Sequence, residues 1–168
     1  MQIEEAFTYC PRCSQKFTPH KGGFPTCSQC GLHFYINPKP CTSVLIFNEH
    51  SELLLVRRAI DPHKGLWDLP GGFIEIRESI IESGKREILE ELSVEIEIDH
   101  IFDALPDMYE YQGIIYPTIS TIMSAHIVSG ILAPKDDVSE FEFTTIENSL
   151  KKDFAFASIP TAIRISTT

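Results

Sequence analysis

Three carboxylates, Glu87, Glu90 and Glu91, stand at positions i, i+3 and i+4 within the stretch from Gly71 to Val94. In a helix this spacing places their side chains on one face. Like charges this close destabilise an exposed helix by about a few tenths of a kcal/mol per pair. A hard cation would relieve that repulsion, since carboxylate oxygens suit Mg²⁺ and Mn²⁺. The sequence therefore predicts a Mg²⁺ or Mn²⁺ site on this helix.

The residues around these glutamates can hold them in place. Arg86 lies beside Glu87 and one turn before Glu90, where its planar guanidinium can bind a carboxylate. Gly84 costs about 1 kcal/mol relative to Ala in mid-helix, which indicates that a neighbouring strand packs close there. The spacing of the apolar residues predicts an amphipathic helix with its acids toward solvent. Its aliphatic stripe would consist of Ile81, Ile88, Leu89 and Leu92.

Eight fixed positions over 23 residues follow a known pattern in register. They are Gly72, Glu78, Arg86, Glu87, Ile88, Glu90, Glu91 and Val94. The stretch resembles the Nudix hydrolase box, G-x5-E-x7-R-E-U-x-E-E-x-G-U, in which U is an aliphatic residue. Two residues depart from the family pattern: Ser93 replaces the last glycine of the box, and Arg77 stands where many members carry glycine.

The resemblance implies hydrolysis of a nucleoside diphosphate linked to another moiety, with divalent cations offsetting the charge of the pyrophosphate. It implies that Glu87, Glu90 and Glu91 bind the metal and that Arg86 orients them. Gly72 would offer a backbone carbonyl, and Glu78 would support the ligands or the fold.

The general base is left open by the resemblance. Family members use either a box glutamate or a residue of a later loop. Glu140, which follows the loop at 134–137 just before a predicted strand, is the candidate here.

Four cysteines form a second set of metal-ligand residues. They fall in two CxxC pairs separated by 13 residues, at Cys10, Cys13, Cys27 and Cys30. Two such pairs at this distance are typical of a zinc ribbon, in which four thiolates surround Zn²⁺. Four thiolate ligands leave no position for water, so the predicted zinc is structural.

Residues 1–36, which contain these cysteines, are too few to bury a core of their own, and a metal then substitutes for one. The segment Asn37-Pro38-Lys39-Pro40 reads as a stiff linker, because each proline restricts its own backbone and the residue before it. We therefore predict a zinc ribbon over 1–36 and a Nudix hydrolase domain over 37–168. The ribbon is expected to brace the neighbouring domain or to contribute to a homodimer contact.

Composition and charge bound the remaining classes of function. The chain has 168 residues, 43% of them hydrophobic, and a formal net charge of −10. The acidic balance argues against a nucleic-acid backbone as the main partner. The sequence contains no apolar run approaching 18 residues, and its first ten residues are too acidic for a signal peptide. We therefore expect a cytoplasmic protein with no membrane association.

The order of apolar runs predicts an α+β fold with a mixed sheet. The runs at 41–47 and 53–58 read as a hairpin, and 67–70 as a strand end. After the box helix we expect strands at 94–98 and near 101–105, a turn over 107–113, and strands at 114–128 and 140–146. Short helices are expected at 147–152 and from Ser158. The Nudix resemblance, which covers roughly 41–165, implies the same α/β/α sandwich.

The identity of the substrate depends on weaker patterns. A zinc ribbon before a Nudix box resembles the NADH pyrophosphatase group, but no SQPWPFP-type motif lies between Ser93 and Pro117. The NPKP linker, the run LLLVRRAIDPHKGLWDLPGG and the late DFAFASI segment look more like ribbon-containing FAD and ADP-ribose pyrophosphatases. The expected substrate is ADP-ribose or FAD before NADH. Aromatic rings that could stack an adenine or flavin are Tyr109, Tyr111, Tyr116 and Phe154.

Three other hypotheses stay open at this point. One is a Nudix-fold module that senses a nucleotide and acts through its ribbon, although degenerate sensors tend to lose box carboxylates that are present here. Another is a zinc-ribbon nucleic-acid adaptor, which the acidic balance disfavours. The third is a nucleoside triphosphate pyrophosphohydrolase. A metal-dependent hydrolysis assay over a panel of nucleotides separates these hypotheses.

Overall fold

The computed structural model describes residues 1–18 and 25–167, so residues 19–24 of the predicted ribbon lie outside it. Three long strands form the first sheet in the order β1-β5-β4. β1 (Lys39–Ile46) runs parallel to β5 (Ile114–Gly130), whereas β4 (Val94–Tyr111) is antiparallel to β5. This combination of pairings confirms the predicted mixed sheet.

A second, smaller sheet is antiparallel throughout and has the order β3-β2-β6. Its strands are β3 (Trp67–Asp68), β2 (Leu53–Arg58) and β6 (Val138–Thr144). The predicted hairpin of 41–47 with 53–58 is wrong as a paired unit, because β1 and β2 belong to different sheets. A backbone bridge between Phe47 and Leu53 joins the two strands next to the turn.

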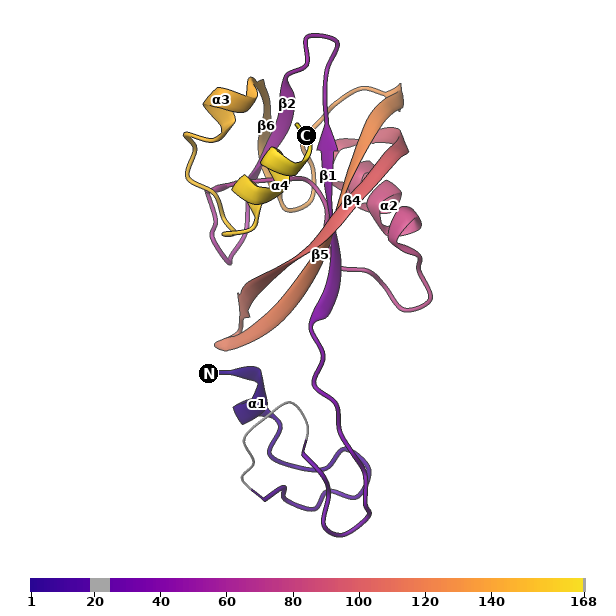
Figure 1. Cartoon of the computed structure of the whole chain (residues 1–168), viewed down its shortest axis with the longest axis vertical. Helices are drawn as coiled ribbons and strands as arrows, with labels where there is room; N and C mark the ends of the chain where they lie inside the picture. The colour runs from indigo at the N-terminus through magenta and orange to yellow at the C-terminus, as the bar shows by residue number, and fades with distance from the viewer. Residues whose placement is uncertain (19–24, 168) are drawn as a thin grey trace.

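Helices lie on both sides of these strands (Figure 1). α2 (Ile80–Leu92), the helix of the glutamate motif, lies on one side of the first sheet, and α4 (Ile159–Ile165) lies on the other with the short α3 (Ile146–Ser149). α1 (Ile3–Ala6) belongs to the N-terminal segment that contains the cysteines.

Alternate residues of the strands pack into two separate hydrophobic cores, one on each face of the sheet. Val44 of β1 packs in one core with Ile88 of α2, and the next residue, Leu45, packs in the other core with Ile163 of α4. All four side chains are fully buried. Because successive strand residues point to opposite faces, a sheet covered by helices on both sides needs apolar residues at consecutive positions. This arrangement confirms the α/β/α sandwich.

The contact between α2 and the sheet differs from the predicted aliphatic stripe. Ile88 and Leu92 are buried, but Ile81 is 42% and Leu89 is 50% exposed. Gly84 instead faces the sheet, where a Cβ would lie 3.0 Å from Met123 Cε. The close approach of the helix at Gly84 rotates Ile81 and Leu89 toward solvent.

The region after α2 is one long strand instead of two strands and a turn. β4 runs from Val94 to Tyr111, and its pairing with β5 shifts at three places, the last between Ile101 and Asp103. These irregularities interrupt the alternation of polar and apolar residues, which explains the false break in the predicted strand. The turn is confined to Gln112 and Gly113, both at positive φ, as a tight hairpin requires.

Pro117 lies in β5 just before pairing with β1 begins at Thr118. The missing N–H of Pro117 therefore costs no hydrogen bond to β1. Beyond this point the N-terminal segment takes the place of β1, since Gln2 bridges to Ile115 and the Ile115 N–H donates to the Met1 carbonyl at 2.8 Å. The cysteine segment is thus attached to the tip of the β4–β5 hairpin.

Candidate active site

Helix α2 begins at a capping box and ends in a left-handed residue. The Ser79 hydroxyl accepts the Glu82 N–H, and the Glu82 carboxylate accepts the Ser79 N–H at 2.8 Å. Ser93 caps the other end at φ 62°, and Arg77, in the loop before the helix, has φ 73°. Both departures from the box pattern therefore stand in the conformation that glycine adopts most readily. The backbone keeps its shape at these positions, at a cost of roughly 1 kcal/mol or more for each residue.

Arg86 lies at the centre of the acidic cluster. Its guanidinium donates two hydrogen bonds to Glu78, at 2.8 and 3.0 Å, and one each to Glu87 at 2.9 Å and Glu90 at 3.0 Å. It also donates to the Phe73 carbonyl at 3.1 Å. The two bonds from Arg86 lower the pKa of Glu78 to about 2. Glu78 is therefore an anion held by Arg86, which agrees with a supporting position behind the other glutamates.

The two glycines before the helix allow the backbone to lie against its carboxylates. The Gly71 N–H donates to Glu91 Oε2 at 2.9 Å. A Cβ on Gly72 would lie 2.5 Å from the Glu87 carboxylate. The Gly72 carbonyl accepts the Thr42 N–H at 2.8 Å, and its second lone pair is available to a further donor or cation.

The three box glutamates differ strongly in exposure, contrary to the prediction that the acids face solvent. Glu90 has a side chain 49% exposed, whereas Glu91 as a residue is only 5% exposed. Burial, the nearby Asp137 carboxylate and the Glu87 carboxylate raise the pKa of Glu91 well above its usual range, and the Gly71 N–H opposes them. Burial also raises the pKa of Glu87, against the hydrogen bond from Arg86.

Asp137 is a member of this cluster that sequence reasoning missed. It lies in the loop before β6, and its carboxylate acts on both Glu87 and Glu91. The loop is held near α2 because the Lys135 N–H donates to the Glu91 carbonyl at 2.8 Å. The run Pro134-Lys135-Asp136-Asp137 identifies this loop in the sequence, but the predicted general base was Glu140.

Glu140 lies on β6 and pairs with Arg57 of β2, carboxylate to guanidinium at 2.8 Å, with about half of each side chain exposed. The Arg57 guanidinium also lies over the Trp67 ring at 5.4 Å. Glu140 is thus part of a surface ion pair, and its role as the base stays a prediction.

The donor set of the cluster fits a hard divalent cation. Several carboxylates face one another with little compensating charge besides Arg86, and buried like charges require neutralisation. Among the described residues, the four cysteines form the one group of three or more such side chains that lie close enough together to hold a metal ion, and the three glutamates do not form another. Arg86 donates to both Glu87 and Glu90 and keeps them apart, so a cation would use the oxygens that Arg86 leaves free.

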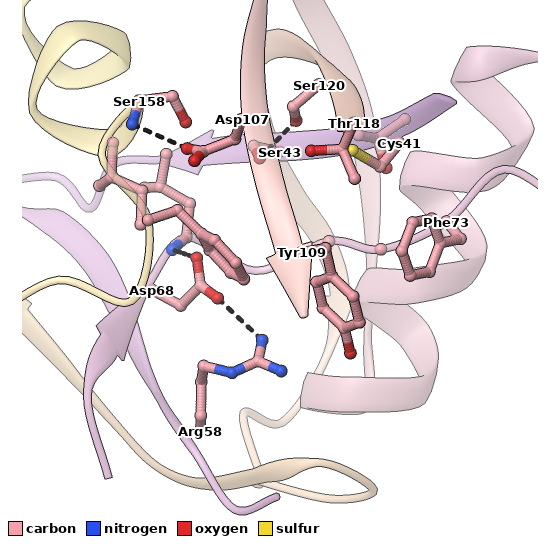
Figure 2. A pocket seen from close by; sticks show the side chains of 16 residues that line it. Cys41, Ser43, Arg58, Asp68, Phe73, Asp107, Tyr109, Thr118, Ser120 and Ser158 are labelled. Atoms are coloured by element: carbon pink, nitrogen blue, oxygen red, sulfur yellow. Dashed lines mark hydrogen bonds and ion pairs between the residues drawn. The ribbon is translucent and has the colours of Figure 1, made fainter. Parts of the chain in front are cut away.

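A cavity of about 80 Å³ lies directly beside Gly71 and Gly72 (Figure 2). Asp68 accepts a hydrogen bond from Arg58 at 3.0 Å in its wall, and Asp107 accepts the Ser158 N–H at 2.9 Å. Burial raises the pKa of Asp68 to about 6, outweighing the Arg58 guanidinium. The aromatic rings in the wall are those of Phe73, Tyr109 and Phe156.

The four predicted zinc ligands come together in the N-terminal segment. Their sulfurs all lie within 4.8 Å of one another, and no disulfide joins them. A tetrahedron with Zn–S bonds of about 2.3 Å has edges of about 3.8 Å. The Cys10–Cys30 and Cys13–Cys27 sulfur separations are 3.7 and 3.5 Å. The backbone N–H of Cys30 lowers the pKa of Cys27 to about 6, whereas, against the Gln15 N–H, burial and the neighbouring thiols raise the pKa of Cys13 to about 12. A bound zinc would hold both as thiolates.

Residues 37–162 match the family profile described as NUDIX domain. The chain belongs to the Nudix family. The resemblance seen in the box is therefore confirmed over most of the chain, and the protein is a Nudix hydrolase. Nudix enzymes generally need a divalent metal, which agrees with the donor set around α2.

Similar proteins include an ADP-ribose pyrophosphatase of Methanocaldococcus jannaschii, 30% identical over 122 residues, which make up 71% of this chain and 69% of that protein. A NAD-capped RNA hydrolase of Schizosaccharomyces pombe is 30% identical over 106 residues, 54% of this Nudix chain and 28% of the relative. The crystal structure of a NUDIX hydrolase from Nitrosomonas europaea shares the fold with a TM-score of 0.73 at 24% identity, covering 94% of this chain and 89% of that one.

The described part of the chain contains no helix with the length and apolar character needed to cross a membrane.

Proposed function

We propose that this Nudix hydrolase cleaves the pyrophosphate of an ADP-linked compound, with ADP-ribose or FAD preferred over NADH. The observation that supports this proposal is the cavity beside Gly71 and Gly72, whose wall combines hydrogen-bonding groups with aromatic rings. The same two glycines contact Glu91 and Glu87. A nucleotide whose base edge enters the cavity would therefore place its phosphates against the glutamates.

Glu87, Glu90 and Glu91 would hold Mg²⁺ or Mn²⁺, with the Gly72 carbonyl as a further oxygen ligand. A bound divalent cation offsets the charge of the pyrophosphate and lowers the pKa of water. Arg86 fixes the orientation of Glu87 and Glu90 through its two hydrogen bonds. Glu78 in turn fixes Arg86 through a bidentate pair.

The reaction consumes one water. Its oxygen forms a bond to one phosphorus, the bridging P–O bond breaks, and the products are AMP and the other half as a phosphate monoester. A carboxylate accepts the proton of the water. Asp137 faces Glu91, whereas Glu140 is held by Arg57, so Asp137 suits this role better than Glu140. A positioned general base contributes about 10²- to 10⁴-fold in rate.

The nucleobase would enter the cavity edge first. Asp68 and Arg58 form a fixed polar pair there, and the Ser43 and Ser120 hydroxyls are 2.8 Å apart on another wall. Such groups read a base by its hydrogen-bonding edge. The Methanocaldococcus jannaschii relative, named ADP-ribose pyrophosphatase, supports an ADP-linked substrate.

The N-terminal segment is proposed to be a zinc ribbon over 1–36 with a structural role, followed by the hydrolase domain over 37–168. Its attachment to the hairpin tip through Gln2 and Ile115 supports bracing as its first role. The second proposed role is a homodimer contact through the same segment. The molar mass of the protein in solution tests it.

The test is a screen with Mg²⁺ and with Mn²⁺ over ADP-ribose, FAD, NADH, dinucleoside polyphosphates and nucleoside triphosphates, with the products identified. We expect AMP and the second monophosphate from ADP-ribose or FAD. A strong preference for a triphosphate with release of inorganic pyrophosphate would contradict the substrate. Binding without turnover of any compound would support a nucleotide sensor instead. Asp137→Asn and Glu140→Gln, compared in the same assay, decide between the two bases.

A further inference from the structure

A second hollow adjoins the cavity and shares Phe73 and Tyr109 with it. Its rings are Phe73, Tyr109, Tyr111 and Tyr116, and the rest of its wall consists of Lys39, Pro40 and Ile74. We call it the aromatic groove. Its volume is about 620 Å³, compared with about 80 Å³ for the cavity. Sites that bury a whole ligand of moderate size have about 300–1,000 Å³, so the groove has room for a complete ring system, whereas the cavity has room for one edge of a base.

The long hairpin explains why three tyrosines meet in the groove. Tyr109 and Tyr111 are two residues apart on β4, and Tyr116 is the direct partner of Tyr109 on β5. Residues with this spacing and pairing share one face of a sheet. The Phe73 ring meets Tyr109 edge to face, with 5.2 Å between the ring centres. Figure 2 shows these two rings side by side at the boundary of the cavity.

One backbone segment connects the groove to the carboxylates. The Gly71–Ile74 segment contacts Glu91 and Glu87 through its glycines, and Phe73 and Ile74 line the groove. The Phe73 carbonyl also accepts a hydrogen bond from Arg86 at 3.1 Å. A ring in the groove is therefore joined through this segment to the glutamates that would hold the pyrophosphate.

The charge of the groove suits an anionic ligand. The whole chain has a net charge of −10, yet none of the described residues that line the groove is acidic. Lys39 lies over the Tyr116 ring with its ammonium 5.0 Å from the ring centre. From there it can attract the phosphate of a ligand that stacks on the rings of the groove.

From these observations we propose that the aromatic groove binds the planar ring of the half of the substrate that is not AMP. The inference rests on the proposed function. The cavity provides fixed hydrogen-bonding groups that can select one base edge, whereas the groove offers ring faces and one cation. Stacking tolerates many ring systems. FAD, whose second half carries a flavin, would occupy both hollows, and ADP-ribose would leave the groove empty.

The test compares two substrates in variants of one residue. Tyr116→Ala should raise KM for FAD by about 10-fold, the size expected for one lost stacking partner, and leave KM for ADP-ribose unchanged. Tyr116→Phe keeps the ring and should restore the KM for FAD. Tyr9→Ala is the matched control, because Tyr9 is an exposed tyrosine outside the groove. An equal rise for both substrates, or no change for FAD, would overturn the proposal.

A binding measurement separates this proposal from the proposed function. FMN, the flavin half alone, needs no hydrolysis to report on the groove. Its fluorescence should be quenched on binding to the wild-type protein and to Tyr116→Phe, and Tyr116→Ala should bind it about 10-fold more weakly. If neither FAD nor ADP-ribose is hydrolysed, the proposed function fails, while FMN binding still tests the groove. Absence of FMN binding to the wild-type protein would overturn the assignment of the groove.

Discussion

Glu91 combines two properties that rarely occur together in a stable helix. It is buried, and it faces the carboxylates of Asp137 and Glu87 with the Gly71 N–H as its hydrogen-bond donor. In the absence of a cation such a residue destabilises the fold, because burial and like charges both penalise its ionised form. Activity and stability should therefore respond to its neutralisation in opposite directions.

We predict that Glu91→Gln lowers turnover by more than about 100-fold, beyond the loss usual for residues that only support a metal ligand. The same change should raise, or at least maintain, the unfolding temperature of the protein in EDTA. Glu90→Gln should lose turnover similarly, without the gain in stability, because Glu90 is half exposed. Turnover at saturating Mg²⁺ and thermal unfolding measure the two effects. Glu75→Gln, an exposed acid outside the box positions, is the control, and unchanged turnover in either variant would refute the assignment.

Asp68 gives a prediction for pH dependence. Its pKa is raised from 3.8 to about 6 in the folded protein, so the folded state binds more protons than the unfolded state between these values. The free energy of unfolding should therefore fall as pH rises from about 4 to 7, by about 3 kcal/mol relative to Asp68→Asn. Denaturant unfolding of both proteins across this range measures the difference. Asp153→Asn, at an exposed position, keeps Asp68 and should follow the wild-type curve. Parallel curves for wild type and Asp68→Asn would disprove the shift.

At the residue scale, the sequence predicted which side chains lie close together but not how far each of them is buried. Helical spacing placed Glu87, Glu90 and Glu91 on one face, and Arg86 among them. The same spacing could not show that the loop carrying Asp137 covers Glu91, because that contact depends on the Lys135 N–H bond to α2. A contact between segments far apart in the chain leaves no periodic signal.

At the scale of elements, substitutions of Gly72 and Gly84 should distinguish an effect on catalysis from an effect on packing. Gly72→Ala should reduce turnover by at least about 10-fold, as for loss of a supporting contact to a metal ligand, because the new Cβ displaces the Glu87 carboxylate. Gly84→Ala is the matched change inside α2. Its gain of about 1 kcal/mol in helix propensity offsets the tight contact with the flexible end of Met123, so stability should change little. Turnover and denaturant unfolding of both variants test this contrast, which equal losses of activity would contradict.

Helices and strands were predicted correctly where the spacing of their apolar residues follows a single buried face. The box helix, the long strand after residue 114 and the C-terminal helix starting near Ser158 were all predicted, and the structure has them as α2, β5 and α4. The prediction divided β4 into two strands because its bulges interrupt the alternation of polar and apolar residues. It paired β1 with β2 as a hairpin because a short turn between two strands does not show whether they belong to the same sheet. Their separation depends on two cores that only the folded chain defines.

At the scale of the whole molecule, zinc should be needed by the N-terminal segment and not by the hydrolase chemistry. We predict about one zinc per chain, and loss of order over residues 1–36 in Cys27→Ser or after chelation. Because the Ile115 N–H donates to the Met1 carbonyl, its hydrogen exchange should accelerate, while amides of α2 stay protected. Elemental analysis and hydrogen exchange measure these changes. Cys41→Ser is the control for a cysteine outside the cluster, and absence of zinc from carefully reduced protein would contradict the prediction.

The overall architecture followed from the sequence because the box motif identifies one family with one fold. The contact between the cysteine segment and the hairpin tip could not be predicted from the sequence. It depends on a backbone hydrogen bond between Met1 and Ile115, which residues of almost any type could form.

The Gly71–Ile74 segment has a consequence for the end of the reaction cycle. Its residues line both the cavity and the aromatic groove, so cleavage of the pyrophosphate would leave one product in each hollow. Neither product would then block the departure of the other. We expect AMP and FMN to be released in either order, and each to bind the enzyme while the other is still present.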